Sequence, residues 1–363
     1  MLYYLLYSLR DAFFGFNVFR YITFRAVGAI ITAFLVSIIL GPYIIRLLKK
    51  FNIGERVRPE EEVPGIYSAH KGKQGTPTMG GAIMIFAIIF STLLWARCDN
   101  RYILLTLFST LWLGVLGFLD DYVKLRTKKG VGLSKRIKFL GQITLGFIVG
   151  IFLFLDANID TSIYFPFFKN LIFNAGIFYI LFVMIVIAGT SNAVNLTDGL
   201  DGLAIGCIIM VALTYSVIGY AAGNIRIADY LYIKHIPGAG ELSVYCAALA
   251  GAGLGFLWFN SYPANVFMGD TGSLALGGGI GVVACCIKKE ILLLIVGGIF
   301  VFEALSVILQ VASFKTRRRR IFLCAPFHHH LQMRGWHEPK IVVRFWIVAA
   351  ILALFTLMTL KLR

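Results

Sequence analysis

Long uninterrupted apolar runs are the feature that most constrains how this 363-residue chain can fold. A run of about 18 or more apolar residues is long enough to cross the hydrocarbon core of a bilayer as a helix. Hydrophobic residues make up 59% of the chain and charged residues only 14%, whereas soluble domains carry roughly a quarter charged residues. The sequence therefore predicts an all-α polytopic membrane protein.

We expect about ten transmembrane helices in a single domain over residues 1–363, because nearly everything outside the apolar runs is loop. The ten predicted spans are 21–46, 79–96, 102–119, 138–156, 175–191, 202–222, 241–258, 273–287, 291–313 and 342–360. The eighth is short and rich in glycine, which weakens its helical pattern. The aromatic first twenty residues predict an interfacial helix ahead of the first span.

Ten spans make the connecting segments alternate between the two sides of the membrane. Of the 34 Lys and Arg residues, each counted with the nearest connector, 22 go with the connectors at 47–78, 120–137, 192–201, 259–272 and 314–341. Because Lys and Arg are enriched in cytoplasmic loops, we expect these connectors in the cytoplasm and both termini in the periplasm. The net charge of +16 has the same origin, and charge that flanks spans argues against nucleic-acid binding.

The same connectors contain all of the unusual polar motifs. These are GTPTMGG (75–81), LDDYVK (119–124), NAVNLTDGLDG (192–202), WFNSYPANVFMGDTGS (258–273) and APFHHH (325–330). The segments on the other side contain nothing comparable. We therefore expect an active site assembled from several cytoplasmic loops.

Adjacent carboxylates, Asp120 and Asp121, directly follow the third span. Neighbouring acids repel each other unless a cation or a basic group offsets them, so one could bind a metal or phosphate partner while the other acts as a base. The alternative is a solvated helix end that pairs with Lys124 and Arg126.

Asn195, Asp198 and Asp201 are spaced by three, which can place them on one face of a helix. Acids flanked by two apolar spans need a ligand, a metal or deep water. The alternative is that Asn195 and Asp198 simply cap the sixth span.

Asp270 lies in FMGDTGS, with glycines nearby on both sides. Glycine lets the backbone approach phosphate closely, and the helix N-terminus that follows offers amide groups to an anion. Asn260 and Phe267 in the same loop could contact a base or ribose. The alternatives are an ordinary N-cap for Asp270 and an interfacial anchor for Phe267.

His328, His329 and His330 follow a basic run. Zinc binding with Cys324 as a fourth ligand is one interpretation, but three consecutive histidines do not easily converge on one tetrahedral ion. Hydrogen bonding to phosphate, or proton transfer, suits them better. The lysines that could neutralise a diphosphate are Lys73, Lys124, Lys138 and Lys315.

Taken in order, LDDYVK, NAVNLTDGLDG, FMGDTGSLALGG and APFHHH resemble the motifs of the polyprenyl-phosphate N-acetylhexosamine-1-phosphate transferase superfamily. QGTPTMGG and the basic stretch ending in APFHHH are similar to its bacterial branch that transfers phospho-N-acetylmuramoyl-pentapeptide. The resemblance covers almost the entire chain. It implies transfer from the UDP derivative to undecaprenyl phosphate, giving UMP and lipid I in the first membrane step of peptidoglycan synthesis. It also implies magnesium, the bacterial inner membrane and a homodimer.

The resemblance further implies roles for individual residues. The catalytic residues would be Asp120, Asp121, Asp270 and His328, with Asp270 as the magnesium ligand. The substrate-binding residues would be Lys73, Lys124, Lys138, Asn195, Asp198, Asp201, Asn260, Phe267, His329 and His330. Direct attack by the lipid phosphate and a two-step route through covalent Asp270 both fit, and we favour direct attack.

Three other functions compete with this interpretation. A sister transferase that uses another UDP-N-acetylhexosamine is the nearest alternative. A secondary transporter would use an intramembrane acid such as Glu303 as a coupling site, but that class gathers charge near the bilayer midplane. An intramembrane metal hydrolase would need a better ligand set than the histidine run supplies.

Overall fold

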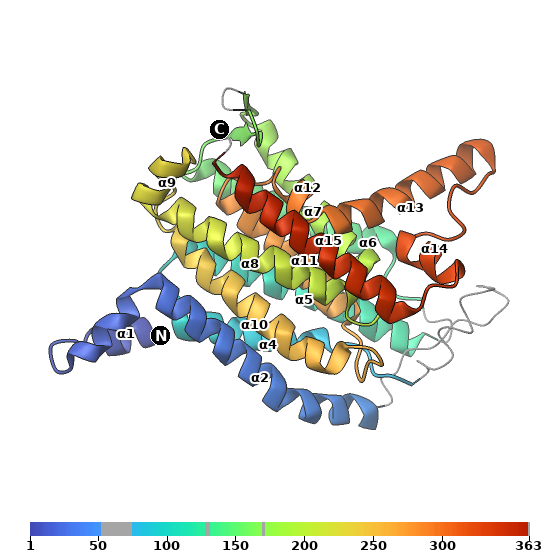
Figure 1. The fold of residues 1–363 in the computed structure, drawn as a ribbon, viewed down its shortest axis with the longest axis horizontal. Coiled ribbons are helices and arrows are strands. Elements are labelled where there is room, and N and C mark those ends of the chain that lie inside the picture. The colour runs from blue at the N-terminus through green and yellow to red at the C-terminus, as the bar shows by residue number, and fades with distance from the viewer. Residues whose placement is uncertain (52–74, 128–130, 169–170, 362–363) are drawn as a thin grey trace.

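The computed structural model describes residues 1–51, 75–127, 131–168 and 171–361, and these form a bundle of helices (Figure 1). The helical elements are α1 (Leu2–Tyr7), η1 (Phe14–Arg20), α2 (Ile22–Lys50), α4 (Gly81–Trp95), α5 (Arg101–Arg126), α6 (Lys135–Leu155), α7 (Phe178–Thr197), α8 (Leu203–Gly223), α9 (Ile225–Leu231), η3 (Ala239–Glu241), α10 (Leu242–Asn260), α11 (Gly269–Cys286), α12 (Leu293–Val296), α13 (Gly298–Arg317), α14 (Phe327–Met333) and α15 (Glu338–Thr359). Within the described residues the one sheet is an antiparallel pair, β1 (Ser162–Tyr164) and β2 (Ile172–Asn174).

Nine helices of the described residues are long and apolar enough to cross a membrane, which confirms the all-α polytopic fold. All ten predicted spans lie on helices, but one of these helices is too short to cross a membrane and another span is interrupted. The 15 residues of α4 extend about 22 Å, less than a hydrocarbon core of about 30 Å. The predicted span 291–313 is interrupted at Gly297, where α12 ends and α13 begins.

The glycine-rich helix α11 lies at the centre of the bundle (Figure 1). It is almost entirely buried, whereas α2 and α13 leave most of their apolar side chains exposed or half-buried, as helices at the surface of a membrane bundle do. A Cβ at Gly278 would lie 1.9 Å from Leu113 Cδ1, so α5 packs directly on the α11 backbone. The glycines that weaken the helical pattern of this segment are therefore the reason it occupies the core.

The connectors separate to two ends of the bundle, as their alternation predicts. At one end the Asn100 side chain donates to the Gly238 carbonyl at 2.9 Å, which joins two connectors. The Met1 ammonium donates to Leu93 O at 2.7 Å, and the Lys361 side chain donates to a carbonyl of α9. Both chain ends therefore lie at this end, and the polar motifs lie at the other.

Candidate active site

Two adjacent carboxylates lie near the end of α5, which continues past the predicted end of that span. The prediction ended at residue 119, but the helix runs to Arg126, and Lys124 pairs with Asp120 one turn earlier at 2.6 Å. Asp120 and Asp121 are each only 3% exposed, so they do not form a solvated helix end, although Lys124 is a partner as that alternative expected. Charges at this degree of burial require partners.

Asp121 is bound to the N-terminus of α11. Its Oδ2 accepts hydrogen bonds from the Thr271 amide at 2.9 Å and the Thr271 hydroxyl at 2.8 Å, and its Oδ1 accepts from the Asp270 amide at 3.2 Å. Unpaired amides and the helix dipole favour a carboxylate at this position. The close approach requires Gly117, because a Cβ there would lie 2.2 Å from the Asp270 carbonyl oxygen. A carboxylate from α5 therefore caps α11.

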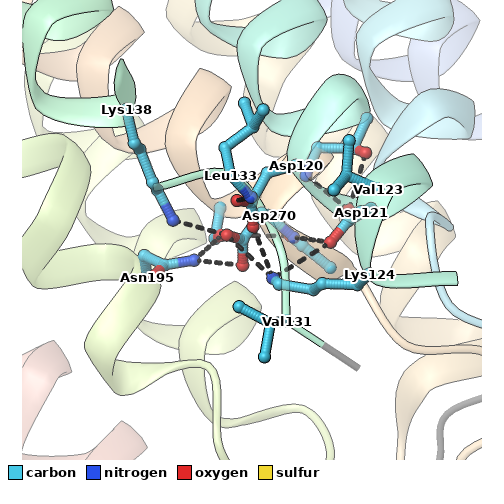
Figure 2. Close-up of polar contacts among 12 residues, drawn as sticks. Asp120, Asp121, Val123, Lys124, Val131, Leu133, Lys138, Asn195 and Asp270 are labelled. Carbon is cyan, nitrogen blue, oxygen red and sulfur yellow. Dashed lines mark hydrogen bonds and ion pairs between the residues drawn. The ribbon is translucent and has the colours of Figure 1, made fainter. Parts of the chain in front are cut away.

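Because α5 supplies that cap, the Asp270 carboxylate does not cap its own helix and faces two lysines and an amide (Figure 2). Its Oδ2 lies 3.0 Å from Lys124 Nζ and also accepts a hydrogen bond from Lys138. Its Oδ1 accepts from Asn195 Nδ2 at 2.8 Å. Helices α5, α6, α7 and α11 thus each contribute a polar side chain to one point.

The three acids form one cluster. One oxygen from each of Asp120, Asp121 and Asp270 lies within 4.8 Å of the others, the only such group of three potential metal ligands in the described part of the chain. Lys124 Nζ lies 2.6, 3.4 and 3.0 Å from their oxygens. Hard oxygen donors suit Mg²⁺. Three carboxylates against Lys124 and Lys138 leave an excess negative charge that a divalent cation would offset.

Asp201 and Asn260 bind backbone groups beside this cluster. Asn260 Oδ1 accepts from the Gly202 amide at 3.0 Å, and its Nδ2 donates to Val266 O at 2.9 Å. Asp201 Oδ2 accepts from the Ala264 amide at 3.0 Å. These side chains join the turn between α7 and α8 to the loop before α11. Their predicted contacts with substrate stay predictions.

Asp198 and Phe267 are both half-buried. Asp198 follows the last residue of α7, and Asn195 lies within that helix. The N-cap of α8 is Gly202, with no side-chain cap, so the alternative in which Asn195 and Asp198 cap the sixth span is wrong. The Phe267 amide donates to Pro77 O at 2.8 Å, and the Gly80 amide donates to Phe267 O at 2.9 Å. These bonds hold the GTPTMGG motif against the FMGD segment. The motif's position among the connectors predicted to lie in the cytoplasm was the one sequence signal for this pairing.

The predicted lysines separate into different environments. Lys124 and Lys138 reach the acid cluster from α5 and α6. Lys315 is exposed near the end of α13. Lys73 lies outside the described residues, and its role stays a prediction.

The three consecutive histidines diverge. His328 is fully buried, and its Nδ1 lies 3.3 Å from Glu303 Oε2. His330 Nδ1 accepts from the Leu323 amide at 3.1 Å, and burial lowers the pKa of His330, which suits a neutral acceptor. His329 is half-buried and bonds within α14. No group of three metal ligands in the described residues includes a histidine, so the zinc alternative lacks support.

Comparison with known proteins gives one consistent result. The profile of glycosyl transferase family 4 matches residues 103–288, which include all three clustered acids. The chain is 53% identical to the phospho-N-acetylmuramoyl-pentapeptide-transferase of Desulfotalea psychrophila and 53% identical to that of Citrifermentans bemidjiense. It is 51% identical to the enzyme of the same name from Desulforapulum autotrophicum. Each of these alignments covers 100% of both chains.

Proposed function

Because the chain belongs to glycosyl transferase family 4, and within it to the phospho-N-acetylmuramoyl-pentapeptide-transferases, we propose that it catalyses the transfer for which they are named. It would move phospho-N-acetylmuramoyl-pentapeptide from its UDP derivative to undecaprenyl phosphate, releasing UMP and forming lipid I. The observation that carries this chemistry is the cluster of Asp120, Asp121 and Asp270 around two lysines at one end of a membrane bundle.

The two lysines would bind the diphosphate of the donor. Phosphoryl transfer needs little covalent chemistry from the protein and depends on positioning and charge stabilisation. Lys124 and Lys138 both contact the Asp270 carboxylate, from different helices. A diphosphate would compete for the same ammonium groups, so the lysines are oriented before substrate arrives. The side chain of Lys124 is 37% exposed, which leaves it accessible from solvent.

The acid cluster fits a magnesium ion, because its oxygen donors are of the type this cation prefers. Asp270 would hold the ion, because its partners are lysine and asparagine side chains that can move aside, whereas the α11 backbone engages both oxygens of Asp121. When bound, the ion would offset charge on the UMP leaving group.

Asp120 would accept the last proton of the lipid phosphate, whose pKa is about 6 as for other phosphomonoesters. We propose direct attack by that phosphate on the donor. Asp270 is a poor candidate for a covalent nucleophile, because Lys124, Lys138 and Asn195 already engage its oxygens. A carboxylate stabilised by two cations and an amide has reduced nucleophilic character.

The decisive experiment supplies purified protein with UDP-N-acetylmuramoyl-pentapeptide, undecaprenyl phosphate and Mg²⁺. We expect UMP and a lipid diphosphate in equal amounts. UDP-N-acetylglucosamine in place of the first substrate should give no product; a product would favour the sister transferase. Chelation should abolish turnover, and adding Mg²⁺ should raise the melting temperature by mass action. Full turnover after exhaustive chelation would remove magnesium from the proposal.

We also propose that the protein lies in the bacterial inner membrane as a homodimer, with the acid cluster facing the cytoplasm. The excess of Lys and Arg in the connectors at that end supports the orientation. In a cysteine-free background, Asn158→Cys should react with an impermeant thiol reagent in intact cells, whereas Arg318→Cys should not. The opposite labelling pattern would reverse the orientation, and a purely monomeric mass in native mass spectrometry would contradict the dimer.

A further inference from the structure

The buried carboxylate of Glu303 in α13 has no role in the chemistry proposed above. Its side chain is fully buried, although most of α13 is not buried inside the bundle. Among the described residues, the one basic group within 4.0 Å of it is His328, whose Nδ1 lies 3.3 Å from Oε2. An acid inside a membrane-spanning helix is costly and points to a function.

The same carboxylate binds the backbone that carries the histidine. Its Oε2 accepts from the Phe327 amide at 2.7 Å, and its Oε1 accepts from the His328 amide at 3.2 Å. Aromatic packing already docks this segment, because the Phe302 and Phe327 rings meet edge to face with centroids 4.8 Å apart. Apolar residues often stabilise a buried site as well as an ion pair does. Docking alone therefore does not explain a carboxylate at position 303.

A carboxylate can do what an apolar side chain cannot, which is to fix the rotation of an imidazole ring. Outer partners of functional histidines act in this way, by holding one ring nitrogen so that the other points in a defined direction. Glu303 Oε2 lies 3.3 Å from Nδ1 without the alignment of a hydrogen bond, and neither ring nitrogen of His328 has a hydrogen-bond partner within the described structure. The ring orientation therefore depends on Glu303 and on packing.

The opposite edge of the His328 ring lies against the turn between α7 and α8. A Cβ at Gly199 would lie 2.3 Å from Nε2, so the imidazole packs directly on the turn backbone. This turn follows Asn195, whose amide donates to Asp270 at 2.8 Å. A continuous set of contacts thus runs from α13 through the histidine and the turn to the acid cluster.

We propose that Glu303 is a positioning residue, which acts through His328 to fix the turn at Gly199 and thereby the contact between Asn195 and Asp270. The proposal rests on the proposed function, because its readout is transferase turnover. It assigns Glu303 to the site although the side chain itself touches none of the clustered acids.

The first test is Glu303→Gln, which keeps the shape of the side chain and one of the two acceptors for the Phe327 and His328 amides but removes the charge facing the imidazole. We expect kcat to fall about 10- to 100-fold, as when a partner that orients a histidine is removed. The matched control is Glu290→Gln, which neutralises a buried carboxylate paired with Lys288 at the other end of the bundle. That variant should lose thermal stability and keep its kcat.

The second test is a double-mutant cycle in the background of His328→Ala. If Glu303 acts through the histidine, Glu303→Gln should cause no further loss of the residual turnover. A purely structural carboxylate would give losses that multiply, and that result would overturn the proposal. Melting curves of each purified variant separate lost folding from lost turnover.

Gly199→Ala tests the other side of the ring and remains informative should Glu303→Gln fail to fold. The added methyl group overlaps the imidazole, so turnover should fall in the otherwise wild-type protein and fall much less with His328→Ala. An equal loss of turnover in both backgrounds would show that Gly199 does not act through the contact with His328. Failure of the proposed function itself is distinguishable, because the unsubstituted protein would then release no UMP.

Discussion

The two ends of the helical bundle balance buried charge in opposite ways. At the end that holds both termini, buried acids have cations of their own: Glu241 pairs with Arg25 at 2.5 Å, and Glu290 pairs with Lys288 at 3.3 Å. At the other end three carboxylates share two lysines. A buried acid paired with its own cation is neutral as a pair and joins two parts of the fold. A cluster with excess negative charge raises the free energy of the folded protein until a cationic ligand binds. Acids are buried at both ends, so an excess of negative charge, rather than burial, distinguishes the candidate active site.

The largest difference between the effect on turnover and the effect on stability is expected for Asp270→Asn. Turnover should fall by about 10²- to 10³-fold or more, as when one preorganised electrostatic group is lost from an active site. The melting temperature should change little, because the substitution removes the repulsion by two acids together with the attraction of two lysines. Turnover and melting of the purified variant measure both effects. Wild-type turnover would remove Asp270 from the mechanism.

Glu241→Gln should have the reverse effect at the other end. It leaves the Arg25 guanidinium buried without its carboxylate, so the free energy of unfolding should fall by about 3–5 kcal/mol. Turnover per folded molecule should not change. The double variant Arg25→Met/Glu241→Leu should recover much of the stability, because it removes both charges together. A single variant as stable as the wild type would contradict the description of this pair as structural.

Asp121→Asn should separate the roles of the two adjacent acids. The amide oxygen can still accept from Thr271, but the NH2 group cannot accept from the Asp270 amide, and the charge at the helix N-terminus is lost, so stability should fall by about 1 kcal/mol. Turnover should fall less than in Asp270→Asn. The matched control is Asp120→Asn, which leaves the cap intact. Hydrogen exchange of residues 269–273 should accelerate in the first variant alone; equal acceleration in both would deny Asp121 its capping role.

The smallest effect is expected from a pH titration of the Asp160–Lys234 pair. Burial opposes the shift, but hydrogen bonds from Lys234 and Tyr164 lower the pKa of Asp160 below its ordinary value of 3.8. A lowered pKa stabilises the folded state above pH 3.8, and the contribution disappears as the pH falls below that value.

The Asp160 side chain is 35% exposed, so the pair contributes less than about 1 kcal/mol. Asp160→Asn should therefore melt slightly earlier than the wild type at neutral pH, and the two melting curves should converge on acidification. A pH-independent difference would show that the ion pair is not its cause. Turnover at neutral pH should not change.

Helix boundaries show where sequence patterns stop being informative. The apolar runs correctly placed all ten predicted spans on helices. The acids predicted to lie in loops, however, lie on helices: Asp120 and Asp121 within α5, and Asp270 in the first turn of α11. A hydropathy pattern does not predict how far a helix continues once its residues become polar. Lys124 pairs with Asp120 along α5, and Asp121 caps α11, so side-chain contacts sustain helices that an apolar pattern no longer marks.

The fold class, the segregation of polar motifs to one end of the bundle and the residue types of the site follow from the amino-acid sequence. These properties depend on run length, alternation and local composition, which can all be read along the chain. Three features required the folded structure: Asp121 caps a helix while Asp120 faces Lys124, His328 is buried, and Glu303 lies beside it. Such contacts depend on helix rotation and on the distance of approach at Gly117, which local patterns do not encode.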